Sequence, residues 1–289
     1  MLKKDIALIA LEHTKKMETD YLAEIAYSIH ESEIFRDDSS FRDRKPPIEN
    51  TDFSLPESKL ISIDSVRALF LPEVQQAMAE GKRIAILNFA SFKNPGGKFL
   101  DGSTAQEEML CHTSYLYNVL ESFYNSYYVP NQRNTFQCLY NHSALYCAGV
   151  RFWNMDLGDE ITEQTPSAIA DVITCAAPNK SAAKKYYDIT SYQIDAELQQ
   201  RIYFIRSICQ IKQVDLLIAG AWGCGVFGND PRFVAHHFKG IFETNSIQYP
   251  QIVIHPVPMV LSRTNYLAFK SKFPNIIEGT ENNEYIEWH

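Results

Sequence analysis

The sequence predicts an α/β fold in which a central mixed β-sheet is covered on both faces by helices. Apolar runs of strand length alternate with helical segments along most of the chain. Two of these runs, residues 83–89 and 214–219, end directly in glycine-rich loops. The 289 residues are 45% hydrophobic, enough for one large core, and no Gly/Ser-rich or Pro-rich linker divides them. We therefore expect a single domain.

The first part of the chain is predicted to be helical with one long loop. Residues 4–18 have the apolar spacing of a helix. The segment from about 30 to 60 is polar and interrupted by prolines, which is typical of a surface loop. Residues 65–80 predict a helix that restarts at Pro72 and ends at Gly81.

The rest of the chain alternates between the two kinds of element. We expect strands at residues 83–89, 143–147, 150–153, 171–178, 214–219 and 252–254, and helices at 104–124, 193–211 and from about Pro231. Ligands of such sheets bind beyond the carboxyl ends of the strands, where both glycine loops are expected.

Charge and cysteine usage narrow the class of protein. Lysine and arginine number 27 against 35 acidic residues, a net charge of −8, which argues against sequence-specific nucleic-acid binding through a global positive field. The six cysteines form no C-x-x-C pair and no metal-type spacing, as expected for reduced cysteines in the cytoplasm. No apolar run reaches the roughly 18 residues of a membrane helix. We expect a cytoplasmic protein without a metal, a cofactor or a membrane segment.

Residues 220–229 form the second glycine loop, with four glycines between a buried strand and the start of a helix. Such a loop offers backbone N–H groups to phosphates. The alternative is a tight turn that needs glycine for shape alone. Phe227 either stacks on a sugar or base or packs into the core, and Cys224 lacks a nearby histidine that would make it a nucleophile.

The first glycine loop runs from Asn88 to a pair of glutamates. Thr104 and Glu107 fit a capping box, with Thr104 as N-cap and Glu107 at the third helical position. This pattern leaves Glu108 unexplained, and local spacing alone does not decide between capping and catalysis. Two phosphate-binding loops imply a ligand with two phosphates. A carboxylate beside that ligand would suit glycosidic cleavage, which needs an acid for the leaving oxygen and a base for water.

These residues resemble the microbial type of poly(ADP-ribose) glycohydrolase, a family with a macrodomain fold. The resemblance rests on Asn88-Phe89-Ala90, Pro95-Gly96-Gly97, Gln106-Glu107-Glu108 and residues 220–229. It extends to His13-Thr14 and to the strand end at residues 176–179. It implies a three-layer α/β/α domain over residues 1–289. Residues 1–80 would form an N-terminal helical extension and loop, and residues 81–289 the macrodomain core.

The resemblance also implies roles for particular residues. Glu108 would be the catalytic acid and base, and Glu107 would help to position the distal ribose. The implied ligand contacts are Asn88, Gly96, Gly97, Gln106, Gly223, Cys224, Gly225, Val226 and Phe227, with Asn265 and Phe269 beside the adenine. Lys98 departs from the family, which has a third glycine there. The lysine would either contact a phosphate or crowd the next ADP-ribose unit, which would favour mono(ADP-ribosyl) substrates.

The expected function is therefore hydrolysis of ADP-ribose, in polymer or single units, from a macromolecule, in the first place a protein. A non-catalytic ADP-ribose-binding module is the alternative, because it would need the same two glycine loops. Glu108 separates the two, since only the hydrolase requires it. A nucleotide-dependent transferase is weaker, because no acidic pair for a metal lies near either loop.

Overall fold

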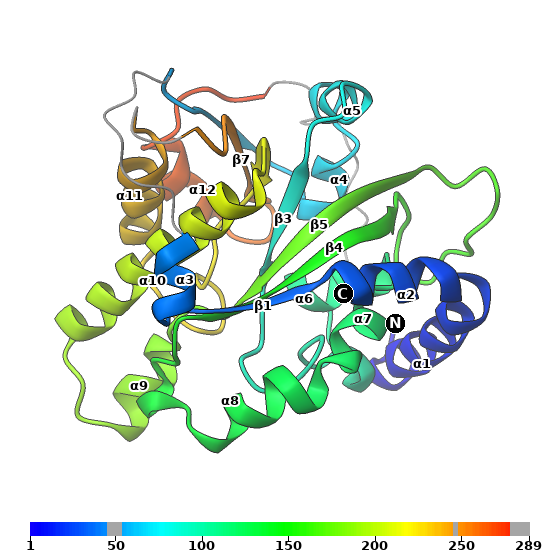
Figure 1. Ribbon diagram of the computed structural model, residues 1–289, viewed down its shortest axis with the longest axis horizontal. Coiled ribbons are helices and arrows are strands. Elements are labelled where there is room, and N and C mark those ends of the chain that lie inside the picture. Colours follow the sequence, from blue (N-terminus) through cyan, green and yellow to red (C-terminus); the bar gives the residue numbers. More distant parts are fainter. Residues whose placement is uncertain (45–53, 245–247, 278–289) are drawn as a thin grey trace.

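The computed structural model describes residues 1–44, 54–244 and 248–277 and contains one seven-stranded sheet (Figure 1). The strand order is β1-β4-β5-β3-β6-β7-β2. The strands are β1 (Glu33–Arg36), β2 (Glu57–Ile61), β3 (Ile84–Phe89), β4 (Ser143–Trp153), β5 (Ser167–Cys175), β6 (Leu216–Ile218) and β7 (Ile252–Pro256). From β5 to β2 all neighbours are parallel, whereas β4 is antiparallel to both β5 and β1. Six strands therefore end at one edge of the sheet, and β4 alone runs the other way.

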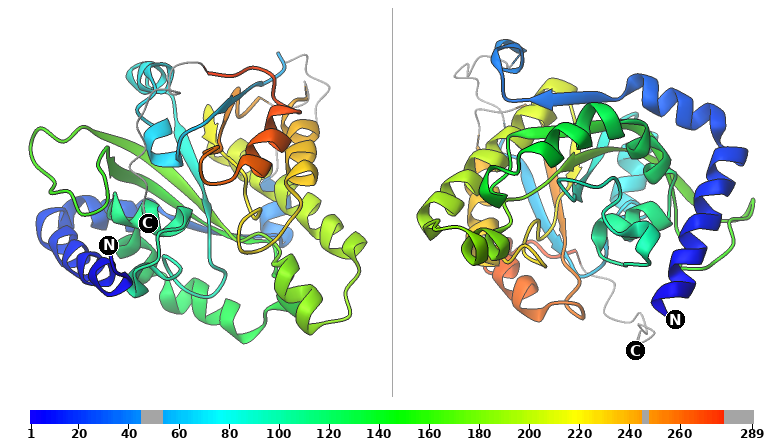
Figure 2. Two further views of the ribbon diagram at one scale, coloured as in Figure 1. Left: turned by 180° about the vertical axis from the view of Figure 1, so that it is seen from behind. Right: turned by 90° about the horizontal axis from the view of Figure 1, so that it is seen from below.

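Helices cover both faces of this sheet (Figure 2). They are α1 (Lys3–Asp20), α2 (Leu22–Glu31), α3 (Ser39–Arg44), α4 (Ser65–Ala68), α5 (Pro72–Ala79), α6 (Gln106–His112), α7 (Leu116–Ser122), α8 (Val129–Arg133), α9 (Lys180–Tyr186), α10 (Ser191–Lys212), α11 (Pro231–Phe242) and α12 (Arg263–Lys270). Three short turns, η1 (Phe99–Asp101), the π-helical η2 (Tyr124–Tyr128) and η3 (Phe136–Cys138), complete the set. The three-layer prediction is confirmed.

The side chains of β3 show how the two layers of core are separated. Ile84 and Ile86 belong to a cluster with residues of α6 and α7, whereas Ala85 and Leu87 belong to one with α10 and α11. Successive residues of a strand point to opposite faces, so a strand buried on both sides needs the continuous apolar run seen in the sequence.

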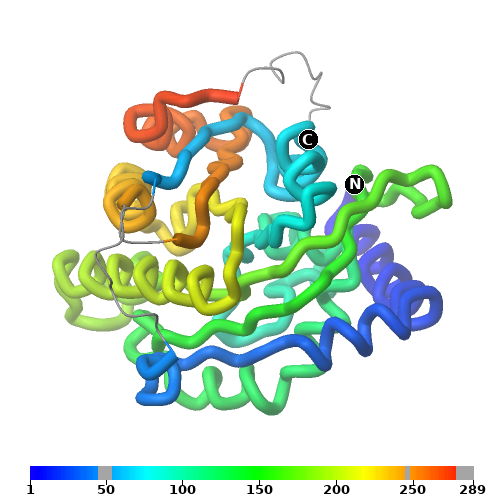
Figure 3. The backbone as a smooth tube through the Cα atoms, turned by 45° about the horizontal axis from the view of Figure 1, so that its top comes forward, coloured from blue at the N-terminus to red at the C-terminus, as the bar shows by residue number. Residues whose placement is uncertain are grey.

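The predicted loop over residues 30–60 is wrong where the structure describes it. Residues 33–36 form β1 beside β4, and residues 57–61 form β2 beside β7, so this segment supplies both edges of the sheet (Figure 3). Edge strands are short and keep polar side chains, which hides them from a search for apolar runs. Pro46 and Pro47, which suggested a loop, lie in residues 45–53, outside the described part, whereas Pro56 directly precedes β2.

Two further elements differ from expectation. The helix predicted over 104–124 is divided into α6 and α7, because the Ser114 hydroxyl donates to the Leu110 carbonyl and accepts from the Leu116 amide. A serine that bonds nearby backbone in this way competes with continuation of a helix. The two strands predicted around Gly149 are one strand, β4, with an irregularity between Cys147 and Val150.

The N-terminal helix α1 packs directly on the chain that leads into α6. A Cβ atom on Gly102 would lie 2.1 Å from the Lys3 carbonyl oxygen and 3.0 Å from the Ala7 nitrogen. Further along α1, His13 Nε2 lies 2.8 Å from the Ser114 carbonyl oxygen. The extension therefore supports the first glycine loop from outside.

We expect Gly102→Ala to destabilise the protein more than Gly81→Ala. Both glycines have a positive φ, +74° and +76°, so alanine strains the backbone by about 1 kcal/mol at each. Only at Gly102 does the methyl group meet α1, which adds about 1 to 3 kcal/mol of overpacking. Urea unfolding of both variants measures the difference. Equal losses would show that α1 does not depend on this contact.

Candidate active site

The two predicted glycine loops lie side by side at the carboxyl edge of the sheet. The first loop follows β3 and the second follows β6, and these strands are parallel neighbours. Phe92 of the first loop and Phe227 of the second share a small apolar cluster with Tyr140 and Ala176. The structure thus brings together segments that are more than a hundred residues apart in the sequence.

Glu107 does not cap its own helix, so the capping-box prediction is wrong. The N-cap of α6 is Ala105, with no side-chain hydrogen bond. Glu107 instead reaches across to the first loop, where its Oε2 accepts from the Ser91 N–H at 2.6 Å and its Oε1 from Asn88 Nδ2 at 3.2 Å. The start of α6 is packed against the end of β3, which puts this carboxylate within reach of that backbone.

Gln106 joins α6 to β3. Its Oε1 accepts from the Phe89 N–H at 2.8 Å, and its Nε2 donates to the Leu87 carbonyl at 3.0 Å and to Ser65 Oγ at 3.2 Å. These bonds supply partners for backbone groups at the point where the strand ends. Gln106 thus positions the two glutamates that follow it. A direct contact with a ligand stays a prediction.

Glu107 and Glu108 converge on Gly97. A Cβ atom on Gly97 would lie 2.6 Å from Glu108 Oε1 and 2.8 Å from Glu107 Oε2. Gly97 also has a φ of +62°, so both space and backbone favour glycine. The next residue, Lys98, has a φ of −112° and an exposed side chain, so its backbone does not require the glycine found there in the resembling family.

Glu108 keeps one oxygen available. Its Oε1 accepts from the Lys98 N–H at 2.9 Å, whereas no described residue provides a hydrogen-bond partner for Oε2. The side chain is only 7% exposed. The two glutamates are therefore unequal, because both oxygens of Glu107 are occupied by donors of the first loop and one oxygen of Glu108 is not.

Burial raises the pKa of Glu107 well above its usual value. The nearby charge of Glu108 raises this pKa further, and the hydrogen bonds from Ser91 and Asn88 oppose the rise. A neighbouring carboxylate and a low dielectric both disfavour a second negative charge. Glu107 therefore holds a proton to a higher pH than an exposed glutamate does.

Asn88 is fully buried between the strand ends. Its Nδ2 donates to Glu107 Oε1 and, at 3.3 Å, to Thr174 Oγ1 at the end of β5. Its Oδ1 has no hydrogen-bond partner among the described residues. Asn88 therefore positions Glu107 and retains an acceptor for a hydroxyl group. Thr174 escaped prediction because the sequence does not show that its hydroxyl lies beside Asn88.

The second loop combines tight packing with an open surface. A Cβ on Gly223 would lie 2.6 Å from that of Ala177, so this glycine serves the shape of the turn. A Cβ atom on Gly225 would meet no atom within 4 Å, and Val226 is 87% exposed. The turn alone therefore explains Gly223 but not Gly225. Burial raises the pKa of the Cys224 thiol, which argues against a nucleophilic role.

Sequence reasoning missed the aromatic support between the loops. Tyr140 stacks on Phe92 with 4.2 Å between ring centroids, and its centroid is 6.1 Å from that of Phe227. Buried Arg201 holds this segment by donating to the carbonyls of Ala176, Leu139 and Tyr140. Arg201 lies on the same face of α10 as the buried apolar residues 194, 198, 202 and 205, and a charged residue at that helical spacing was the available signal.

The residues predicted beside the adenine have different environments. Asn265 is half-buried in the first turn of α12, where its N–H donates to Ser262 Oγ at 3.3 Å. Phe269 is fully buried against His255 and Phe273, so it offers no free face for stacking and is not retained.

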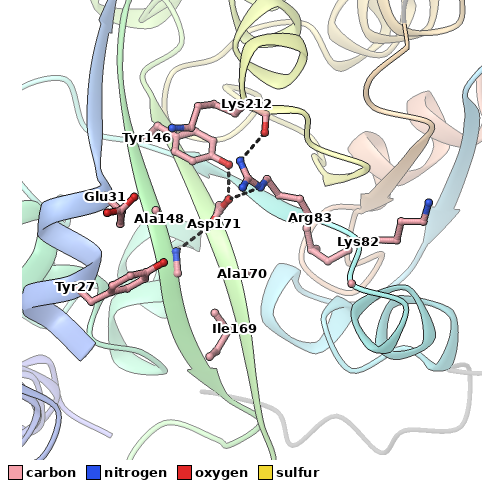
Figure 4. A pocket seen from close by; sticks show the side chains of 13 residues that line it. Tyr27, Glu31, Lys82, Arg83, Tyr146, Ala148, Ile169, Ala170, Asp171 and Lys212 are labelled. Carbon is pink, nitrogen blue, oxygen red and sulfur yellow. Dashed lines mark hydrogen bonds and ion pairs between the residues drawn. The ribbon is translucent and has the colours of Figure 1, made fainter. Parts of the chain in front are cut away.

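A cavity of about 320 Å³ lies at the opposite end of β3 from the glycine loops (Figure 4). Its polar groups bond to one another. Asp171 accepts from the Tyr146 hydroxyl and from the Gly149 N–H, and Arg83 Nη1 donates to the Lys212 carbonyl at 2.7 Å. We interpret this network as structural and place the candidate site at the two loops.

Among the described residues, no group of three or more histidine, cysteine or acidic side chains is arranged to hold a metal ion. None of the helices in the described ranges has both the length and the apolar composition needed to cross a membrane.

Comparisons with known proteins agree with this geometry. Residues 10–155 match the family described as "Microbial-type PARG, catalytic domain". The structure is similar to a poly(ADP-ribose) glycohydrolase from Thermomonospora curvata, with 25% identity, coverage of 93% of this chain and 100% of that one, and a TM-score of 0.79. The same protein bound to the inhibitor ADP-HPD matches with 26% identity, the same coverage and a TM-score of 0.77.

A second relative is the glycohydrolase from Deinococcus radiodurans, solved in complex with ADP-ribose. It is 26% identical, with coverage of 86% of this chain and 97% of that chain and a TM-score of 0.74. No curated protein matches the sequence. The family match includes the first glycine loop and α6, and the structural matches extend over most of the chain.

We expect the free energy of unfolding of Glu107→Gln, relative to that of the unmutated protein, to be higher at pH 8 than at pH 5. The glutamine NH₂ group meets one of the two donors that face Glu107, and this cost is the same at both pH values. A raised pKa in the folded state contributes stability that is fully present below the unfolded pKa and is lost as the pH rises through the folded pKa. Glutamine has no proton to lose. The free energy of unfolding of the variant, relative to the unmutated protein, should therefore grow by roughly 1.4 kcal/mol for each pH unit between the pKa of Glu107 in the unfolded state and its pKa in the folded state.

Urea unfolding at both pH values measures this effect, with Glu12→Gln on the exposed side of α1 as the control. A gain that is the same at both pH values would contradict the raised pKa.

Proposed function

The chain belongs to the family of microbial-type poly(ADP-ribose) glycohydrolase catalytic domains, and from this premise we propose how its residues cleave ADP-ribose from a macromolecule. The bond that breaks is the glycosidic bond at the anomeric carbon of the distal ribose. The observation that carries the proposal is the convergence of Glu107 and Glu108 on Gly97, with one oxygen of Glu108 left free.

The ligand is placed by the two loops. The diphosphate lies over the backbone of Gly223 to Phe227, where the surface around Gly225 is open. The distal ribose lies over Gly97, where a side chain would meet both carboxylates. A side chain on Gly96 would instead meet Tyr117 and Cys111, so this glycine lets the loop pack against α6 and α7. The free acceptor of Asn88 receives a ribose hydroxyl.

Glu108 acts as acid and then as base. It gives a proton to the leaving oxygen as the bond to the anomeric carbon breaks, and the ribose passes through an oxocarbenium-like state. Glu108 then takes a proton from a water molecule whose oxygen bonds to that carbon. The products are free ADP-ribose and the acceptor hydroxyl, and the reaction uses water and no cofactor.

Glu107 positions the reacting groups without exchanging protons itself. Donors from Ser91 and Asn88 fix its carboxyl group against the first loop. Its raised pKa limits the negative charge beside Glu108. The macromolecule that carries the ADP-ribose is most simply a protein in the cytoplasm, because the acidic chain has no global field for nucleic acid.

We expect Glu108→Ala to lower kcat for release of ADP-ribose by about 10²- to 10⁴-fold, the usual contribution of general acid and base catalysis. ADP-ribose should still bind, because the loops that hold it are unchanged, and calorimetry measures this. Glu12→Ala is the control, since Glu12 is exposed on α1. Undiminished turnover would remove Glu108 from the mechanism. If the unmutated protein binds ADP-ribose but releases none from any modified substrate, it is a binding module and not a hydrolase.

We expect Gly97→Ala to lower kcat by about 10²-fold, whereas Gly81→Ala keeps the rate. Both substitutions put alanine at a positive φ, +62° and +76°. At Gly97 the methyl group would displace both carboxylates, whereas at Gly81 it meets no atom within 4 Å. A misplacement of about 1 Å costs on the order of 10²-fold in rate. Steady-state kinetics on the same substrate measures both variants, and equal rates would refute the convergence at Gly97.

A further inference from the structure

The side chain of Tyr140 lies between the two glycine loops. Its ring stacks on that of Phe92 with 4.2 Å between centroids and 13° between the ring planes, and its centroid is 6.1 Å from that of Phe227. Phe92 belongs to the first loop and Phe227 to the second, and the three rings share one apolar cluster with Ala176. Tyr140 is only 9% exposed. A single buried ring therefore packs against both loops.

The two loops also meet at their bases. A Cβ atom on Gly220, just after β6, would lie 2.9 Å from Phe89 Cζ at the end of β3. Phe92 and Phe227 lie further along their loops than this point. One contact at the base would leave the loops free to swing relative to each other, whereas a second contact further out fixes their separation. Tyr140 supplies that second contact.

The backbone of Tyr140 is held in an uncommon conformation. Its φ is +65°, in the left-handed region that bulky residues rarely adopt. The fully buried Arg201 holds it there, because its Nη2 donates to the Leu139 carbonyl at 3.1 Å and to the Tyr140 carbonyl at 3.2 Å. Such strain persists only where the surroundings impose it, and it is concentrated at functional sites. A ring that only filled space would not require it.

Helix α9 holds the backbone of the second loop and that of the segment before Tyr140. The Ser181 N–H donates to the Phe227 carbonyl at 3.0 Å. Asn179, the N-cap of this helix, donates its N–H to the Cys138 carbonyl at 2.9 Å. Tyr140 and the second loop are therefore anchored to the same helix, and the ring stack joins them to the first loop.

We propose that Tyr140 is a positioning residue that sets the distance between the bound diphosphate and the distal ribose. The proposal rests on the proposed function, in which the second loop holds the diphosphate and the first holds the ribose. These two groups are joined covalently, so a ligand seated on one loop reaches the other only at one separation. By fixing that separation, Tyr140 lets binding of the diphosphate place the ribose beside Glu108. It exchanges no proton in the reaction.

The first test compares the binding of two ligands by calorimetry. ADP reaches only the second loop, whereas ADP-ribose reaches both. We expect Tyr140→Leu to weaken the binding of ADP-ribose by about tenfold, because the loops are no longer held at the separation that the ligand needs. The affinity for ADP should be unchanged. Equal weakening of both ligands would show general damage to the site, and undiminished binding of ADP-ribose would show that the stack does not set the separation. Either result overturns the proposal.

Turnover gives a second test. In Tyr140→Leu, kcat for release of ADP-ribose should fall by about 10²-fold, the usual cost of a misplacement of about 1 Å at the reacting centre. Tyr140→Phe keeps the ring and removes only the hydroxyl group, so this variant should keep its kcat and its affinity for ADP-ribose. If Tyr140→Phe loses as much as Tyr140→Leu, the hydroxyl group carries the role and the stack does not.

Phe242→Leu is the matched control. Phe242 is 1% exposed and stacks on Phe238 with 5.6 Å between ring centroids, at the end of α11 that is far from the second loop. Both leucine variants lose a buried, stacked ring, so urea unfolding should show a similar loss of stability in each. Only Tyr140→Leu should lose turnover. A similar loss of turnover in Phe242→Leu would trace the effect to stability and refute a positioning role.

The binding comparison also separates this proposal from the catalytic one, because it involves no bond cleavage. Full turnover by Glu108→Ala would refute the catalytic assignment and leave the difference between ADP and ADP-ribose in Tyr140→Leu standing. If Glu108 is confirmed and that difference is absent, the positioning role of Tyr140 alone is wrong.

Discussion

The hydrogen bonds between the first turn of α6 and the end of β3 determine the geometry of the whole site. Gln106 bonds to the backbone of Leu87 and Phe89, and Glu107 bonds to the backbone of Ser91. A helix start anchored in this way cannot slide along the sheet without losing several buried bonds at once. The position of Glu108 follows from this anchor, because it is the next residue of the same turn.

Support for the anchored loop comes from three parts of the chain. The N-terminal helix packs on Gly102, α8 bonds to the carbonyls of Phe92 and Lys93, and Arg201 holds the segment that ends in Tyr140. Each contact meets backbone or a buried ring, and α1 and α10 belong to the core clusters on opposite faces of the sheet. These contacts hold the loop in place, as expected for a site in which two carboxylates must be positioned.

The sequence predicted those parts of the molecule that depend on local pattern. β3, β6 and the glycine loops that follow them were visible because strands buried on both faces are continuously apolar and their exit loops need small residues. The edge strands β1 and β2 were missed, because their polar side chains face water and leave no continuous apolar run in the sequence. The capping box failed for another reason. Its spacing is satisfied locally, but Glu107 finds better partners on Ser91 and Asn88, which only the folded chain brings near.

The contact between α1 and Gly102 also has a consequence for the order of folding. Lys3 and Gly102 are roughly a hundred residues apart, and contacts between distant residues form late because a long loop must close first. Helix α1 leaves the ribosome long before the segment against which it packs. It cannot form this contact until that segment has been synthesised. The loop that carries Gly97 can therefore reach its final shape only when the two ends of this stretch have met. We therefore expect the glutamate pair to reach its final arrangement late in folding.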